Sequence, residues 1–325
     1  MDKVSLKISI SPRDFRILKY LLPHQLKVWH GQVDEVLIVF DYHGYDKGPY
    51  KKQISQITEF ICELEKEYPK LCLVAVDYSD EAKAEVSRAY FGNKTVPEKT
   101  HRYGPYYSYF YGLYHTKYDY VMNLDCDLFF GGNNPNWTRE AVALMKSDAS
   151  VITCSPLPGP PTADGKLVTQ AGQMDDSELR KVLFDSFSTR IFFVYKPSFI
   201  SQLCPIPVEV AELSSLVRAV AKRKPIWALP EDILTNTMRR KKLKRADFLG
   251  TGEGLWSLHP PFRNEEFFEK LPELVKRIET GDIPDAQRGD YDINDSMINW
   301  DDAWEELKNA SIKRKIYSAL GVKKS

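Results

Sequence analysis

The stretch from Tyr118 to Gly132, YDYVMNLDCDLFFGG, constrains the fold of this chain more than any other. Its apolar part, Tyr120 to Leu124, is typical of a buried strand and runs directly into Asp125-Cys126-Asp127. Side chains two positions apart in extended backbone point the same way, so both carboxylates are expected to face one site. Carboxylate oxygens suit Mg2+ or Mn2+, which keep open positions for water and phosphate. The stretch therefore predicts a phosphate-bearing ligand held through a metal.

An ordinary turn is the alternative interpretation of these acids. Asp is common in turns, and the run from Gly131 to Pro135, GGNNP, has turn composition. Position favours the ligand site, because open α/β sheets bind their ligands beyond the carboxyl ends of buried strands.

Strands and helices alternate along the chain. Apolar residues at helical spacing predict helices over 15–29 and 50–68, and an aromatic-rich helix over about 105–115. Predicted strands are Leu6 to Ile10, Glu35 to Phe40, Leu71 to Val76, Ser150 to Cys154 and Arg190 to Tyr195. A strand, helix, strand succession of this length is a βαβ unit with parallel strands. We predict an α/β fold with a mostly parallel central sheet flanked by helices.

Charge and cysteine usage narrow the function classes. The chain has 45 Lys plus Arg and 45 Asp plus Glu, whereas a nucleic-acid binder normally carries a basic excess. Its 5 cysteines are odd in number and scattered, which favours a reducing compartment. The start of the sequence lacks a signal-peptide core, and no apolar run reaches the roughly 20 residues that span a bilayer. We predict a cytoplasmic protein without a nucleic-acid partner.

The order of strands leading to Asp125-Cys126-Asp127 resembles that of the nucleotide-sugar glycosyltransferases of GT-A fold, in particular the family 2-like group. The resemblance covers roughly residues 4–262. It implies a GT-A domain over 1–264, and the amphipathic pattern beyond it predicts a C-terminal helical extension over 265–325.

The resemblance implies a nucleoside site after the first two strands. The matching positions are Ser11, Pro12, Arg13 and Asp41, although the family's usual ending of the first strand, Pro followed by Thr or Ser and then Asn, is absent. Asp41 suits a uracil imide or a ribose hydroxyl, and equally a turn at a strand end. Arg102, shortly before the aromatic helix, is a further candidate for binding the nucleotide.

The resemblance also implies a metal site and a catalytic pair. In this family the second acid, here Asp127, usually binds the Mn2+ or Mg2+ directly, and Asp125 contacts ribose or binds through water. His259, in SLHPP, stands where some members have a further metal ligand. Glu231-Asp232 matches the acidic pair that opens a helix beside the acceptor in inverting members, and Asp232 is the expected base.

The leading hypothesis is a metal-dependent glycosyltransferase, UDP-sugar favoured, with a saccharide, lipid-linked or small-molecule acceptor. A nucleotidyltransferase is the alternative within enzymes, but its usual Gly-rich phosphate loop is missing after the first strand. A non-catalytic nucleotide- or sugar-binding protein and a retaining mechanism stay open. The basic run from Arg239 to Arg245 is read as a solvated helix end or as a peripheral contact with the inner face of a membrane.

Overall fold

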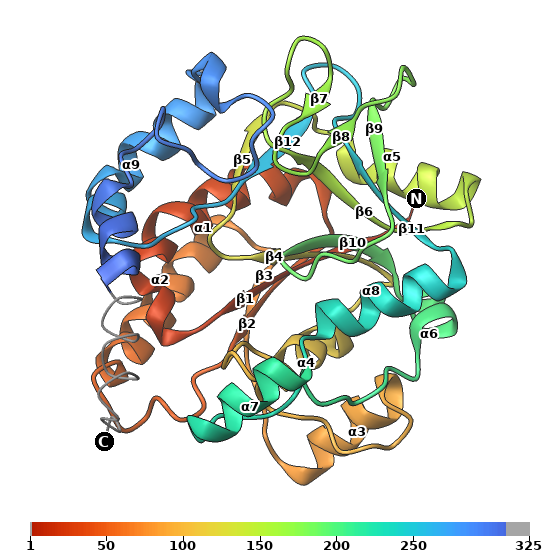
Figure 1. Ribbon diagram of the computed structural model, residues 1–325, viewed down its shortest axis with the longest axis vertical. Helices are drawn as coiled ribbons and strands as arrows, with labels where there is room; N and C mark the ends of the chain where they lie inside the picture. Colours follow the sequence, from red (N-terminus) through yellow and green to blue (C-terminus); the bar gives the residue numbers. More distant parts are fainter. Residues whose placement is uncertain (1, 310–325) are drawn as a thin grey trace.

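The computed structural model describes residues 2–309 of the protein. They form one large central sheet with helices on both faces (Figure 1). The sheet has 10 strands, eight of them in the order β3-β2-β1-β4-β10-β6-β11-β9. These eight are β1 (Val4–Ile10), β2 (Glu35–Phe40), β3 (Leu71–Ala75), β4 (Tyr120–Asp125), β6 (Val151–Pro158), β9 (Lys181–Phe184), β10 (Ile191–Tyr195) and β11 (Lys244–Phe248). The last two, β5 (Phe129–Gly132) and β12 (Leu255–Leu258), pair with each other, and β12 also pairs with β6.

The amino-terminal half of the sheet is parallel. β1 pairs in parallel with both β2 and β4, and β2 pairs in parallel with β3. The chain thus moves outward from β1 to β3 and then returns to the other side of β1. This confirms the predicted α/β class with a mostly parallel central sheet, and the carboxyl ends of β1, β2 and β4 meet at one edge.

β10 is the exception within the centre of the sheet. It lies between β4 and β6 and runs antiparallel to both. The residues that precede β10 therefore lie at the edge where β4 ends. A small separate hairpin of β7 (Lys166–Leu167) and β8 (Gly172–Gln173) belongs to the same long connection between β6 and β10.

Helices cover both faces of the sheet and bury its side chains in two cores. One face packs against α1 (Phe15–Trp29), α2 (Lys51–Glu67) and α5 (Trp137–Ser147). The other packs against α3 (Asp80–Tyr90), α4 (Tyr107–His115), α6 (Lys196–Leu203) and α8 (Pro230–Lys241). α7 (Leu213–Ala221) lies on the same side as α8 (Figure 1). The aromatic helix α4 is almost wholly buried, as its composition predicts for a helix in the core.

The carboxyl-terminal part of the described chain packs on the side of the sheet that carries α1. α9 (Glu265–Glu279) packs against α1 and β5. Its buried Phe267 and Leu271 share a cluster with Ile17 and Phe129. Residues 301–309 are helical, and the part of the predicted extension over 310–325 lies outside the described residues. The domain boundary at residue 264 stays a prediction.

The glycine run after the two acids differs from the sequence expectation. Gly131 and Gly132 lie in β5 and pair with β12, so they belong to a strand rather than to a turn. The reason is tertiary: a Cβ on Gly131 would lie 2.0 Å from the Trp256 ring, and one on Gly132 would lie 2.3 Å from the Gly254 carbonyl. Glycine is needed here because β12 approaches closely.

Candidate functional site

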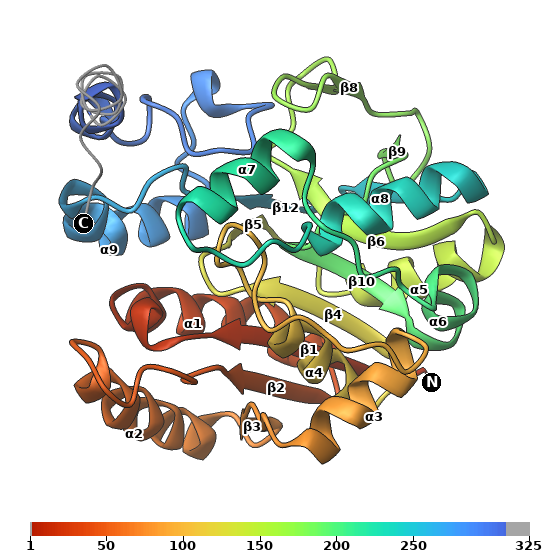
Figure 2. The same cartoon turned by 60° about the horizontal axis from the view of Figure 1, so that its bottom comes forward.

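A cavity of about 270 Å³ opens at the carboxyl ends of β1, β2 and β4. Figure 2 shows these ends on the side where α7 and α9 lie, with the amino terminus on the opposite side. The chain reverses its strand order between β1 and β4, which is where doubly wound sheets bind ligands. Of the residues predicted from the sequence, Ser11, Arg13, Asp41, Asp125 and Asp127 all line this cavity.

Asp127 is the most tightly enclosed acid in the cavity. It lies in the turn after β4, and Asp125 is the last residue of the strand. Asp127 Oδ2 accepts a hydrogen bond from Arg263 at 2.5 Å and lies 3.4 Å from His259 Nε2. Asp127 Oδ1 is buried and has no hydrogen-bond partner in the described part of the chain. A buried carboxylate oxygen without a partner is costly unless a ligand completes it.

His259 is oriented by a second carboxylate. Its Nδ1 lies 3.1 Å from Asp292 Oδ1, and its ring stacks on Tyr291 with centroids 5.9 Å apart. Contact of Nδ1 with a carboxylate leaves Nε2 facing Asp127, an arrangement that orients many metal-bound histidines. The predicted pairing of Asp127 with His259 is therefore present in space, although the two residues are far apart in the sequence.

A divalent cation fits this pair of side chains as an open site. Asp127 Oδ1 and, when its Nε2 is unprotonated, His259 would supply two ligands, and a cation that binds a diphosphate needs positions left for water and phosphate oxygens. Within residues 2–309 no group of three or more His, Cys, Asp or Glu side chains is arranged around a common metal position. A cation held by Asp127 and His259 would therefore take further ligands from water or from the phosphate of a bound ligand.

The two acids differ in protonation. Burial and repulsion from Asp127 raise the pKa of Asp125 to about 7. Burial also opposes ionisation of Asp127, but hydrogen bonding to His259 and the charge of Arg263 hold its pKa well below the usual range. The surroundings thus favour ionisation of Asp127 over that of Asp125.

A chain of polar contacts links the loop after β1 to Asp127. The Ser11 backbone N–H and hydroxyl both donate to Asp14 Oδ2, at 2.8 and 2.7 Å. Asp14 Oδ1 accepts from Arg263 at 3.0 Å, and Arg263 continues to Asp127. Pro12 is buried at the start of a 3-10 turn and does not line the cavity. Its place in the predicted site is thus to shape the loop around Ser11.

The end of the cavity formed by the loops after β1 and β2 is lined by aromatic and charged groups. The Arg13 guanidinium lies over the rings of Tyr45 and Tyr50, at 5.7 and 5.6 Å from their centroids. Asp41 Oδ2 accepts hydrogen bonds from Lys99 Nζ at 2.7 Å and from the Tyr78 hydroxyl at 3.1 Å. Asp41 is therefore held by an ion pair at the cavity wall rather than in a solvated turn.

The acidic pair at the start of α8 is split between two roles. Glu231 accepts hydrogen bonds from the backbone N–H and the hydroxyl of Thr189, at 3.0 and 2.9 Å. Asp232 is exposed, and no described side chain donates a hydrogen bond to it. Partial desolvation of its carboxyl and repulsion from Glu231 raise the pKa of Asp232, and the Arg102 cation opposes them. Arg102 does not line the cavity, and its contact with a nucleotide stays a prediction.

Thr189 and the residue after it join α8 to the acids of β4. The Arg190 carbonyl accepts a hydrogen bond from the Asp125 backbone N–H at 2.8 Å. The Tyr109 hydroxyl donates to the Thr189 carbonyl at 3.0 Å. The candidate base and the candidate metal ligand thus belong to one contiguous region around the end of β4.

Several polar residues of this region were not foreseen from the sequence. Arg263 and Asp292 gave no local signal, because their partners are remote in the chain. Lys7 did give one, as a lysine within the apolar strand VSLKISI. It is completely buried, donates to Asn123 Oδ1 at 2.7 Å and lies 4.3 Å from the centre of the Tyr109 ring. Burial lowers the pKa of Lys7 to about 7.

The basic run from Arg239 to Arg245 does not form a continuous charged face. Arg245 is buried and pairs with Asp247 at 2.9 Å, which contradicts a surface role for this residue. Arg239 lies 3.3 Å from Asp185, and Lys241 donates to the carbonyl of Gln202. Side chains alternate between the two faces of β11, and Arg245 lies on a buried face. None of the described helices is long and apolar enough to cross a membrane.

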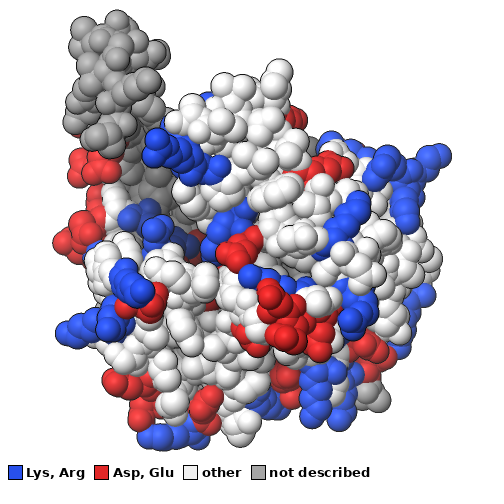
Figure 3. Space-filling view, turned by 90° about the horizontal axis from the view of Figure 1, so that it is seen from below, with Lys and Arg blue, Asp and Glu red and all other residues white. Residues whose placement is uncertain are grey.

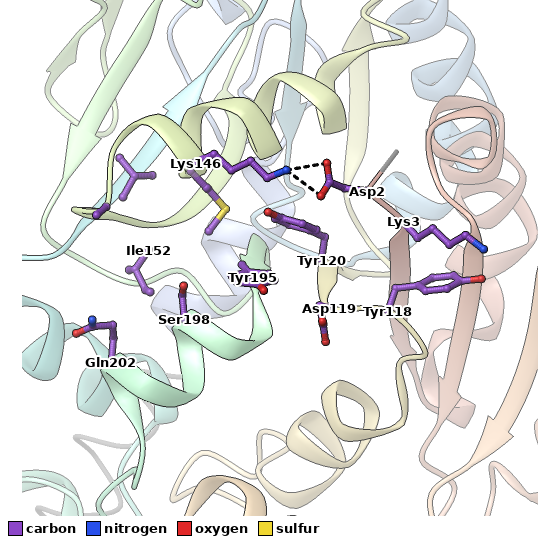
Figure 4. Close-up of a pocket in the computed structure, with 13 residues that line it drawn as sticks. Asp2, Lys3, Tyr118, Asp119, Tyr120, Lys146, Ile152, Tyr195, Ser198 and Gln202 are labelled. Carbon is purple, nitrogen blue, oxygen red and sulfur yellow. Dashed lines mark hydrogen bonds and ion pairs between the residues drawn. The ribbon is translucent and has the colours of Figure 1, made fainter.

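A second cavity, of about 680 Å³, lies at the opposite ends of β1 and β4 (Figure 4). The Asp2–Lys146 ion pair and the rings of Tyr120 and Tyr195 line it. None of the predicted site residues reaches this cavity. Volume alone therefore does not identify the functional site.

Comparison with known proteins gives structural neighbours only. No protein-family model and no curated protein matches the sequence. The galactosyltransferase LgtC, in complex with donor and acceptor sugar analogs, is 10% identical with a TM-score of 0.33, and the match covers 72% of this chain and 70% of that one. S. aureus TarS 1–349 in complex with UDP-GlcNAc is 14% identical with a TM-score of 0.42, covering 84% and 65%.

A third neighbour is the mannosyltransferase PcManGT from Pyrobaculum calidifontis in complex with GDP-Man and Mn2+. It is 12% identical with a TM-score of 0.39, and the match covers 86% of this chain and 63% of that one. The chain is thus similar in structure to several glycosyltransferases. At these identities and TM-scores, an assignment of function has to rest on the side chains of the site.

Proposed function

We propose that this protein is a metal-dependent glycosyltransferase that moves a sugar from a nucleoside-diphosphate donor, UDP-sugar favoured, to a hydroxyl of a saccharide, lipid-linked or small-molecule acceptor. The observation that carries the proposal is Asp127, which lines a cavity at the ends of β1, β2 and β4 and whose buried Oδ1 has no hydrogen-bond partner among residues 2–309. A cytoplasmic setting belongs to the same proposal, since all five cysteines are free.

The cation, Mn2+ or Mg2+, would be held by Asp127 and His259. Bound there, it would supply positive charge where the leaving diphosphate gains negative charge. Asp292 fixes the ring of His259 through Nδ1, which keeps Nε2 directed at Asp127. Asp125, whose pKa is raised, is suited to hydrogen bonding with a ribose hydroxyl. Arg263 contributes a guanidinium at the same edge of the cavity.

The donor's nucleoside would lie along the loops after β1 and β2. Arg13 with its tyrosines forms one wall, and Asp41 with Lys99 forms another. Ser11 acts through Asp14, which it fixes for the contact with Arg263. These contacts preorganise the cavity before a ligand enters, which lowers the entropic cost of binding.

Asp232 is the proposed base. It accepts the proton of the acceptor hydroxyl while that oxygen forms a bond to the anomeric carbon and the bond from this carbon to the diphosphate breaks. Attack opposite the leaving group inverts the anomeric configuration. A raised pKa makes Asp232 a better proton acceptor than an ordinary carboxylate, and the hydrogen bonds from Thr189 hold Glu231 in place beside it.

The test separates donor binding from transfer. Thermal stabilisation is measured with a panel of nucleoside diphosphates in Mn2+, Mg2+ or chelator, for wild type, Asp127→Ala, Asp232→Asn and the exposed control Asp119→Ala. Release of nucleoside diphosphate from the matching nucleotide sugar is then followed with candidate acceptors. We expect metal-dependent stabilisation in all proteins except Asp127→Ala, and loss of transfer without loss of stabilisation in Asp232→Asn.

Two outcomes would contradict the proposal in different ways. If no nucleotide stabilises the wild type in any metal, the cavity is not a donor site. If nucleotides stabilise it but Asp232→Asn retains full transfer, the donor site stands and Asp232 is not the base. The configuration of the product, read by nuclear magnetic resonance, then distinguishes an inverting from a retaining reaction.

A further inference from the structure

α7 presents apolar side chains to solvent rather than to the core. Leu213, Val217 and Val220 recur at helical spacing on one face, with 77%, 60% and 61% of their surface exposed. Val210, just before the helix, is 49% exposed, and Ala219 is the one buried residue of α7. A helix that folds only against its own protein points such residues inward, so this face is arranged for an external contact.

Basic side chains adjoin the apolar face. Arg218 lies within α7, and Lys222, Arg223 and Lys224 follow its end. Among residues 2–309 no carboxylate forms an ion pair with any of these four. Figure 3 looks onto the side of the molecule that carries α7, where uncharged surface fills much of the upper half and charged side chains of both signs border it. We call the four aliphatic and four basic residues together the α7 surface.

The α7 surface borders the candidate site. Lys224 Nζ lies 5.0 Å from the centre of the Tyr103 ring, and Tyr103 lines the cavity of Asp127. At the other end of the helix, the charge of Glu212 contributes to raising the pKa of Asp232, after burial and Glu231. Whatever covers α7 is therefore held beside the mouth of the cavity.

We propose that the α7 surface docks on an anionic lipid bilayer. Aliphatic side chains on one face enter the boundary between headgroups and acyl chains, and neighbouring cations meet anionic headgroups, as in interfacial amphipathic helices. A second copy of this chain fits less well, because a stable protein interface uses roughly 20–30 residues a side and like charges would adjoin. The proposal is independent of the reaction proposed above.

This site differs from the basic run at the end of α8. There Arg245 is buried, Arg239 pairs with Asp185, and no row of exposed aliphatic side chains accompanies the charges. At α7, cations that form no ion pair within residues 2–309 lie beside exposed Leu213 and Val217. Electrostatic attraction and burial of apolar surface can therefore act together at this surface. The geometry thus favours α7 as the contact surface.

The full-length protein is tested by sedimentation with vesicles of phosphatidylcholine alone and of phosphatidylcholine with phosphatidylglycerol. We expect binding to the anionic vesicles that weakens in high salt. Leu213→Ser with Val217→Ser should lower the partition coefficient tenfold or more, since each loses most of its inserted apolar surface. Val168→Ser, 62% exposed elsewhere, is the matched control and should bind like wild type. Thermal midpoints report whether each variant is folded.

A second experiment tests the charges by reversing two basic residues after α7 and, for comparison, two basic residues of α8. Lys222→Glu with Arg223→Glu should abolish binding to anionic vesicles, and Arg239→Glu with Arg240→Glu should leave most of it. The proposal would be overturned if wild type did not sediment with anionic vesicles, or if the α7 variants bound them as well as wild type does. The proposal would also be overturned if light scattering showed that wild type is a dimer and that Leu213→Ser with Val217→Ser dissociates it, because α7 would then contact a second copy of the chain.

Discussion

Replacing Arg263 by methionine tests whether a cation belongs at Asp127. Arg263 donates to Asp127 at 2.5 Å and to Asp14 at 3.0 Å, and its removal leaves Asp127 with His259 alone. Breaking a fully buried ion pair costs about 3–5 kcal/mol, whereas an exposed pair contributes about 0–1 kcal/mol. Because 38% of the Arg263 side chain is exposed and 7% of Asp127, we expect a loss of about 2 kcal/mol in the free energy of unfolding in chelator.

Mn2+ should reverse much of that loss. In the wild type the guanidinium already neutralises Asp127, so a cation without nucleotide gains less there than in Arg263→Met. A ligand at 100 times its dissociation constant stabilises the folded state by about 2.7 kcal/mol, which is enough to offset the deficit. The assay is urea unfolding followed by circular dichroism, in chelator and in Mn2+, without nucleotide.

Arg16→Met is the matched control for this experiment. Arg16 makes two hydrogen bonds of 2.7 Å to Glu265, but both side chains are exposed. Its loss should cost at most about 1 kcal/mol and should be the same with and without Mn2+. If Arg263→Met shows no deficit in chelator, or the same deficit in Mn2+, then Arg263 does not stand in for a cation and the reasoning about Asp127 fails.

Three further outcomes are expected. Gly131→Ala should lower the free energy of unfolding by about 1–3 kcal/mol in chemical denaturation, because the added methyl group would overlap the Trp256 ring. Burial raises the pKa of Asp247 from its ordinary 3.8 to about 6, so the folded state loses stability as the pH rises through that interval. Asp247→Asn should abolish this pH dependence, which is measured as the free energy of unfolding of wild type and variant at a series of pH values. Arg102→Leu should move the acidic limb of the pH–rate profile to higher pH, because burial raises the pKa of Asp232 and the Arg102 cation opposes it; an unmoved limb would separate Asp232 from the rate.

Local apolar runs predicted the strands well, because β1, β2 and β4 are buried on both faces. The strand expected over Glu35–Phe40 has those bounds in the structure. The aromatic helix and the acids at the end of β4 also lie where their neighbours in sequence place them. These features depend on interactions within one element or between adjacent ones.

The partners of the site depend on contacts between distant segments, which a single sequence does not show. Arg263 reaches Asp127 only because α9 and the segment before it fold back over β5 and α1. The strand conformation of Gly131 likewise depends on a distant segment, because its partner in the sheet is Trp256 of β12. The influence of Arg102 on Asp232 is also not visible in the sequence, because it depends on the contact of the neighbouring His101 with Trp227, shortly before α8.

The reversed direction of β10 has a consequence for how such a protein can diversify. A parallel strand delivers to the site the loop that follows it, whereas β10 delivers the loop that precedes it, with Thr189 and Arg190 beside Glu231 and Asp125. That loop begins at the end of β6 and includes the β7–β8 hairpin. Insertions there can remodel the side of the site near Glu231 while the loops after β1 and β2 remain untouched. In the proposed glycosyltransferase, the choice of acceptor and the choice of donor are thereby free to change independently.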